Sequence, residues 1–263
     1  MYIDTHCHLD AAEFAADRAE VAARARAAGV GMLVVPGVEC AGFDALLETC
    51  HRFPGCRPAL GIHPMYVDLA QPADLDVLRS AVVAHKPVAI GEIGLDFLVP
   101  TGVFVPGYDR EKQEFYLVEQ LKIAREFNLP VLLHLRRAQD TLLKFLRRFP
   151  VPGGIAHAFN GSRQQAEAFI KLGFKLGFGG AMTWPRALHL RELAATLPLE
   201  SIVLETDAPD IPPEFVGKGG RNSPEYLPRI AQCLAGLRRV PLDEIAAATR
   251  ANSLQVLPGL RET

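Results

Sequence analysis

The chain has 263 residues, of which 49% are hydrophobic, so it can bury a large core. Its 28 Lys and Arg residues and 30 Asp and Glu residues give a formal net charge of −2. This even balance excludes a global field that draws the protein onto long stretches of nucleic acid, so any recognition of phosphate must be local.

Short β-rich runs alternate with amphipathic helical stretches along the chain. The expected strands are residues 2–5, 31–35, 57–62, 87–91, 130–133, 154–156, 174–178 and 201–205. The helical patterns between them include residues 17–28, 43–52, 110–127, 139–149 and 163–172. Many runs are continuously apolar, as strands are when both faces of a parallel sheet are covered. Eight such units without a break in composition predict one domain over residues 1–263, an α/β fold that forms a single (β/α)8 TIM barrel.

The alternative fold is an open doubly wound sheet, but no Gly-rich phosphate loop follows the first run. Segment 98–107, which reads LVPTGVFVPG, departs from the alternation with two prolines and two glycines. In a barrel this segment lies at the end that carries the candidate ligands. A flap over the site and a surface loop without a role both fit it.

Histidine and glutamate side chains stand where two of the expected strands end. His6 and His8 follow the first run, and residues two apart on an extended chain face the same side, about 6.6–7 Å apart. Glu92 follows the fourth run, and its two carboxylate oxygens could bridge two cations. Taken alone, an H-x-H pair is a weak sign of a metal site, and a lone Glu is more often a loop residue or a helix cap.

Three more candidate ligands stand at the ends of later runs. His134 and His157 directly follow the fifth and sixth runs. Each alone is more often a hydrogen-bonded core histidine, but two at equivalent strand ends, opposite the H-x-H pair, favour metal ligands. Asp207 follows the eighth run and can both ligate a metal and accept a proton from a water bound to it.

These positions give four imidazoles and two carboxylates from five strands as candidate metal ligands: His6, His8, Glu92, His134, His157 and Asp207. Mixed nitrogen and oxygen ligation suits Zn²⁺, Mn²⁺ or Mg²⁺. Six ligands are too many for one tetrahedral structural zinc. Two divalent metal ions about 3.5–4 Å apart fit better and would activate a water, with Asp207 and Glu92 as the catalytic residues.

Four further polar residues are candidates for binding the substrate. His63 follows the third run and could contact a scissile phosphate, although packing in the core is the other interpretation. Arg136 faces the same side as the histidine two residues before it and could reach an anionic oxygen. Arg221 and Asn222 follow a Gly-rich loop after the eighth run, a region where barrel enzymes often bind phosphate.

The start of the chain and its cysteines indicate a location. Met1 leads directly into an expected strand, which leaves no room for a signal peptide. No apolar stretch approaches the roughly 18 residues of a membrane span. The five cysteines lack the spacing of a zinc ribbon, which favours reduced thiols. We therefore expect a cytoplasmic protein without membrane contact and without an obligate protein partner.

The ordered motifs resemble the TatD family of metal-dependent hydrolases. The resemblance rests on His6-Cys7-His8-Leu9-Asp10, Gly91-Glu92-Ile93-Gly94-Leu95-Asp96, His134-Leu135-Arg136, His157-Ala158-Phe159-Asn160-Gly161 and Glu205-Thr206-Asp207-Ala208-Pro209. Gly61-Ile62-His63-Pro64 and Arg221-Asn222-Ser223-Pro224 fit two further landmarks of the family. Seven motifs in order are specific to the family, though not to a substrate.

The resemblance implies a TIM-barrel phosphodiesterase of the amidohydrolase superfamily. Members are described as deoxyribonucleases, often 3′-to-5′ exonucleases on single-stranded DNA or RNA, so the implied substrates are nucleic-acid ends or nucleotides. Carried over by residue, the H-x-H pair and Asp207 would hold one metal, and His134 and His157 would hold the second. Glu92 would bridge the two metals, and Asp207 would also be the base or proton shuttle.

Two other functions fit the same residues. The first is a metal-dependent amidase, lactonase or (aminoacyl) esterase of the same superfamily. Many relatives of that kind bridge their metals with a carboxylated lysine from the fourth strand, where this chain has Glu92. The second is a metal-binding regulatory protein without catalysis, which the presence of all six ligands argues against. We therefore expect a divalent-metal-dependent hydrolase of the deoxyribonuclease type.

Overall fold

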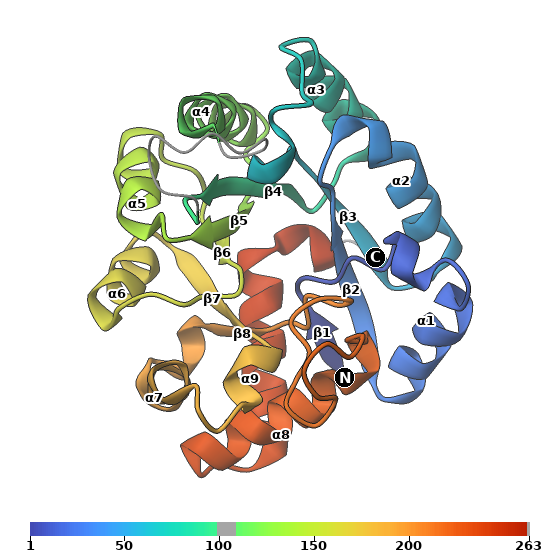
Figure 1. Cartoon of the computed structure of the whole chain (residues 1–263), viewed down its shortest axis with the longest axis vertical. Coiled ribbons are helices and arrows are strands. Elements are labelled where there is room, and N and C mark those ends of the chain that lie inside the picture. Colours follow the sequence, from blue (N-terminus) through green and yellow to red (C-terminus); the bar gives the residue numbers. More distant parts are fainter. Residues whose placement is uncertain (99–108, 262–263) are drawn as a thin grey trace.

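The computed structural model describes residues 1–98 and 109–261, and in them eight parallel strands pair in chain order from β1 to β8. Figure 1 shows the strands at the centre, with the helices around them. The strands are Tyr2–Asp4 (β1), Val30–Pro36 (β2), Cys56–Leu60 (β3), Ala89–Asp96 (β4), Val131–Arg136 (β5), Gly154–Ala156 (β6), Phe174–Phe178 (β7) and Ile202–Leu204 (β8). The predicted (β/α)8 TIM barrel is confirmed.

A helix lies between each pair of consecutive strands, and two more follow β8, within the described residues. The helices are Arg18–Ala27 (α1), Phe43–Arg52 (α2), Asp74–His85 (α3), Arg110–Glu126 (α4), Gln139–Arg148 (α5), Arg163–Lys171 (α6), Leu188–Thr196 (α7), Leu227–Arg238 (α8) and Leu242–Val256 (α9). The five helices predicted from sequence patterns are confirmed to within one residue at each end.

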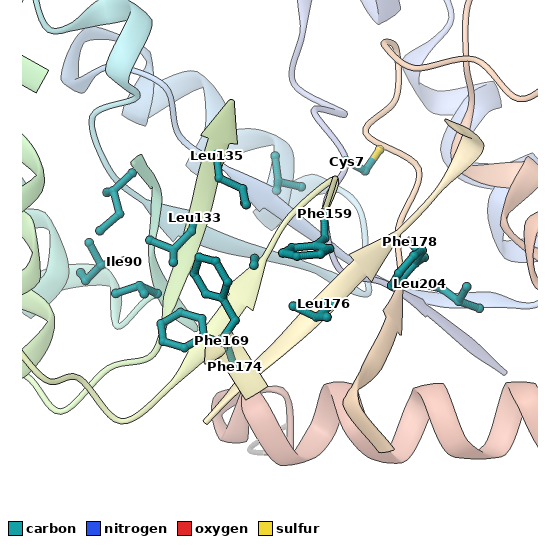
Figure 2. Packing of buried hydrophobic residues seen from close by; sticks show 14 of the residues in the cluster. Cys7, Ile90, Leu133, Leu135, Phe159, Phe169, Phe174, Leu176, Phe178 and Leu204 are labelled. Carbon is teal, nitrogen blue, oxygen red and sulfur yellow. The ribbon is translucent and has the colours of Figure 1, made fainter. Parts of the chain in front are cut away.

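Alternate strand residues pack into two separate hydrophobic clusters. Leu132 and Val203 belong to an inner cluster, which also contains Val256 at the end of α9. Their neighbours Leu133 and Leu204 belong to the outer cluster between strands and helices, part of which Figure 2 shows. Because strand side chains alternate between faces, apolar runs without interruption supply both clusters at once.

Two strands extend by several residues beyond their predicted ends. The sequence predicted strands at 87–91 and 130–133, whereas β4 and β5 continue to Asp96 and Arg136. The extra residues pair with each other, as Gly94 does with His134. Glu92 and His134 therefore lie within strands, where the backbone fixes them more firmly than a loop would.

The barrel closes where β1 and the segment after β8 meet. The amide of Thr5 donates to the carbonyl of Leu204 at 3.1 Å, and the amide of Asp207 donates to the carbonyl of His6 at 2.8 Å. This backbone contact continues past the strand ends. It brings the H-x-H segment and the Asp207 loop together although about two hundred residues separate them.

Three other predictions concern the whole chain. The packing of all eight units around a shared core supports one domain over residues 1–263, which stays our proposal. The segment 98–107, which fits either a flap or a surface loop without a role, lies outside the described residues apart from Leu98. In the parts of the chain that the structure describes, no helix has both the length and the apolar character that a membrane crossing requires.

A buried glutamine on α4 fixes the backbone just before His63. The Gln120 side chain accepts from the amide of Ile62 at 2.7 Å and donates to its carbonyl at 3.0 Å. Gln120 is 1% exposed, so water cannot replace these bonds. The two bonds satisfy both polar groups of a residue that lies beyond the end of β3.

We predict that Gln120→Ala destabilises the protein by roughly 2–6 kcal/mol, because two buried backbone groups lose their partners at about 1–3 kcal/mol each. The measurement is the midpoint of urea unfolding at an unchanged slope. Lys122→Ala on the same helix is the control, because the Lys122 side chain is exposed and pairs with Glu119 at the surface. Equal midpoints for the two variants would contradict the prediction.

Candidate metal centre

The candidate ligands meet at the carboxyl-terminal ends of the strands, in a cavity of about 890 Å³. Five of the six predicted ligands line the cavity, and His6 lies fully buried beneath it. Glu92 on β4 lies at the centre of the group and is only 2% exposed. The six residues that the sequence singled out as ligands are thus brought together.

One oxygen of Glu92 faces the H-x-H pair and Asp207. Glu92 Oε2 lies 3.1 Å from His6 Nε2 and 3.8 Å from His8 Nε2. Asp207 Oδ1 lies 3.6 Å from each of the same two nitrogens. The two imidazole nitrogens are themselves 3.3 Å apart. Four donor atoms of the kinds that bind divalent metals therefore surround one point.

The other oxygen of Glu92 faces a second group of imidazoles. Glu92 Oε1 lies 3.0 Å from His134 Nδ1, 3.5 Å from His63 Nε2 and 3.8 Å from His157 Nε2. His157 Nε2 is also 3.9 Å from Asp207 Oδ2. One carboxylate thus stands between two sets of donors, and Asp207 also reaches both.

Burial and mutual charge shift the pKa values of these groups strongly. Burial, followed by repulsion from a neighbouring imidazolium, lowers the pKa of His6 to about 3. Burial opposes protonation of His157 too, yet the carboxylates around it raise its pKa to about 10. Burial raises the pKa of Asp207 to about 6. Although burial also disfavours the charged Glu92, the surrounding histidines hold its pKa well below the usual range. The ionised form of the buried carboxylates is therefore stable only when positive charge lies close to them inside the site.

These residues fit a divalent cation. Three groups of His, Asp and Glu side chains have ligand atoms that all lie within 4.8 Å of one another. They are His6, His8 and Glu92; His6, His157 and Asp207; and His63, Glu92 and His134. His6 Nε2 and His8 Nε2 face each other at 3.3 Å. Two imidazole nitrogens in this position stabilise each other little, whereas a cation between them can bind the lone pairs of both.

Two buried carboxylates orient the histidines from behind. Glu205 Oε1 lies 3.1 Å from His157 Nδ1 and accepts from the amide of Ala158 at 2.6 Å. Asp96 Oδ2 lies 3.0 Å from His134 Nε2. A partner on one ring nitrogen fixes which of the two nitrogens faces the metal. His157 thus presents Nε2 to the site and His134 presents Nδ1.

A glycine makes room for the first of these carboxylates. A Cβ atom on Gly177 would overlap the carboxylate of Glu205. The missing side chain at this position lets Glu205 approach His157. Asp96 also accepts from the amide of Leu98 at 2.9 Å, and sequence reasoning did not find its contact with His134.

The four candidate substrate residues fall into two pairs. His63 and Arg136 line the cavity, and the Arg136 side chain is exposed there. Arg221 instead binds both oxygens of Asp17, at 2.8 and 2.6 Å, and Asn222 is fully buried. The Asn222 amide donates to three carbonyls of the segment 206–211. This placement does not support a substrate contact for the second pair, because Asp17 engages the Arg221 guanidinium and backbone carbonyls of the segment 206–211 engage the Asn222 amide.

Sequence reasoning did not find the residues that clamp this loop. Asp4 accepts from the Thr206 hydroxyl at 2.6 Å and from its amide at 2.9 Å. Asp4 also accepts from the amide of His6 at 3.2 Å. Asp4 therefore fixes the backbone on both sides of the barrel closure. The sequence signal that could have indicated this clamp is the small polar residue Thr206 directly before the candidate ligand Asp207.

Comparison with known proteins shows which family the chain is similar to. The sequence profile of the family described as "TatD related DNase" matches residues 3–258. The uncharacterised metal-dependent hydrolase YjjV of Escherichia coli K12 is 42% identical over 96% of both chains. Its crystal structure matches with a TM-score of 0.91 over 98% of each chain. The 3′-5′ ssDNA/RNA exonuclease TatD of Salmonella typhimurium is 35% identical over 95% of this chain and 96% of its own.

We predict that Glu205→Gln weakens divalent-metal binding about 10- to 100-fold, the usual effect of removing a group that orients a metal-ligating histidine. The cause is the loss of the anionic acceptor behind His157 Nδ1. Calorimetric titration of the metal-free protein with Mn²⁺ measures the effect. The exposed Glu200 supplies the matched control, Glu200→Gln, which should bind Mn²⁺ as the unmodified protein does. An unchanged affinity in Glu205→Gln would refute the orienting role.

Proposed function

We propose that this chain, which belongs to the TatD family of metal-dependent hydrolases, is a phosphodiesterase that removes nucleotides from the 3′ end of single-stranded DNA or RNA. The observation that carries the proposal is the position of Glu92, whose two oxygens face two separate sets of donors. The name of the Salmonella relative supports the nuclease activity, and the name of YjjV supports only a metal-dependent hydrolase.

We propose two divalent metal ions as the cofactors. His6, His8, Asp207 and Glu92 would hold one ion, and His134, His157 and Glu92 would hold the other. A pair of divalent ions, when bound, activates a water and stabilises the negative charge that develops on both the attacking and the departing oxygen. Mg²⁺, Mn²⁺ and Zn²⁺ all suit this mixed set of imidazoles and carboxylates.

The protein's own residues would then bind and orient the substrate and move protons. Asp207 would take up a proton at Oδ2, because its carboxylate lines the cavity in which the substrate would bind. Arg136 lines the same cavity with an exposed guanidinium and would bind an anionic oxygen of the substrate. The Asn222 amide would keep Asp207 in place, because it holds the carbonyls on both sides of that residue.

The depth of the site supports a single-stranded end as substrate. The central carboxylate is 2% exposed, so the scissile bond has to enter the cavity to reach it. A free strand end can enter without loss of base pairing, whereas a duplex first has to unstack and unpair its terminal bases. All five cysteines are free thiols, which supports the cytoplasm as the place of action.

We predict that the purified protein with Mg²⁺ or Mn²⁺ shortens a single-stranded oligonucleotide labelled at its 5′ end, one nucleotide at a time. His157→Ala and Asp207→Asn should each lower the rate by at least about 10²-fold, the usual cost of removing one electrostatic or proton-transfer group. Gel electrophoresis of the products measures the rate. Removal of metal with EDTA should stop the reaction, and added Mn²⁺ should restore it.

The outcomes of a substrate panel separate this proposal from the esterase and lactonase alternatives. The panel contains single-stranded and duplex DNA, RNA, a 5′-blocked and a 3′-blocked oligonucleotide, and model esters and lactones. The proposal requires that a 3′ block protects the oligonucleotide and that a 5′ block does not. Cleavage of esters or lactones without release of any nucleotide would overturn it.

A further inference from the structure

We propose that His63 donates a hydrogen bond to the substrate through Nε2–H and does not hold a metal ion. This role deepens the proposed function, because the acceptor is taken to be an oxygen of the phosphodiester. His63 Nε2 lies with Glu92 and His134 among donor atoms that could hold a metal. Distances alone therefore do not separate a fifth histidine ligand from a hydrogen-bond donor. The other ring nitrogen of His63 does.

The backbone after His63 occupies its Nδ1 atom. A short 3-10 helix, Pro64–Tyr66, begins directly after His63, and its first residue has no amide hydrogen. The first free amide of this helix is that of Met65, which donates to His63 Nδ1 at 3.1 Å. A neutral imidazole carries one proton, so a ring that accepts at Nδ1 carries its proton at Nε2. This nitrogen therefore offers a hydrogen and no lone pair to the cavity.

The neighbouring contacts agree with this tautomer. His63 Nε2 lies 3.1 Å from His134 Nδ1, and His134 Nε2 lies 3.0 Å from Asp96 Oδ2. An ionised carboxylate only accepts, so His134 carries its proton at Nε2 and has its lone pair at Nδ1. The bonds run in one direction, from the Met65 amide through both rings to Asp96. His134 can ligate through Nδ1, and His63 can only donate.

The position of the His63 ring directs this hydrogen toward the substrate. His63 lines the cavity although it is only 7% exposed, and its Nε2 is 3.5 Å from Glu92 Oε1. His134 Nδ1 and Glu92 Oε1 are acceptors close to this hydrogen, and metal ions would engage both of them in the loaded protein. A phosphoryl oxygen bound beside Glu92 would then receive the hydrogen bond. If the His63 ring rotated so that the lone pair of Nδ1 faced the cavity, the hydrogen bond from the Met65 amide would be lost.

The tautomer can be measured without any substitution. Long-range ¹H–¹⁵N correlation spectra of the full chain with ¹⁵N-labelled histidine distinguish a protonated Nδ1 from a protonated Nε2. We expect His63 to carry its proton at Nε2 both without metal and with Zn²⁺ bound. A deprotonated Nε2 in the zinc-loaded protein would overturn the proposal.

Two substitutions of His63 separate its two nitrogens. In His63→Asn, the amide can still accept from Met65 but no longer reaches into the cavity. In His63→Gln, an N–H group still reaches the position of Nε2. Both variants should bind as many Mn²⁺ ions as the unmodified protein after equilibrium dialysis, whereas His134→Ala should bind fewer. Loss of one Mn²⁺ ion in either His63 variant would show a ligand and overturn the proposal.

The same pair tests the contact with the substrate. With bis(p-nitrophenyl) phosphate, His63→Asn should lower kcat/KM about 10²- to 10³-fold, as the loss of one positioned donor does. His63→Gln should stay within about tenfold of the unmodified protein, since it keeps a donor. Equal losses in both variants would overturn the donor role. If the unmodified protein cleaves no phosphodiester at all, the proposed function fails, and the tautomer and the Mn²⁺ counts still decide between donor and ligand.

Discussion

The whole site depends on one buried negative charge. Glu92 is 2% exposed, and its two oxygens lie within 3.8 Å of imidazoles that come from four other strands or the loops after them. A carboxylate so far from water is costly unless positive charge compensates it. Together with Asp207, it makes the cavity a place where divalent cations are stabilised. The barrel contributes a common level at which all these side chains converge.

The second requirement is that each histidine presents a defined nitrogen. Glu205 fixes His157 with Nε2 toward the site, and Asp96 fixes His134 with Nδ1 toward the site. These partners lie on or directly beside other strands, so each ligand is positioned across the sheet and not by its own neighbours in sequence. The partner of one ring nitrogen decides whether the other nitrogen offers a lone pair to a metal or a hydrogen to an acceptor.

Much of the site could be predicted because it depends on local pattern. His6 and His8 face one side through strand alternation, and strand ends in a parallel barrel share one face. The prediction for Arg221 shows the limit of this reasoning. A basic residue after the eighth strand suggested phosphate binding, yet its guanidinium pairs with Asp17, 204 residues earlier. Nothing in the spacing of either residue indicates that contact.

The sequence by itself determined the barrel and the chemical kinds of its ligands, because apolar periodicity and the residues that end each run are local properties. The tertiary structure decided where β4 ends, since the pairing of Gly94 with His134 extends that strand past Glu92. It also decided which carboxylate supports which histidine and which nitrogen faces the cavity. Those choices depend on distances between strands far apart in the chain, and only the closed sheet sets them.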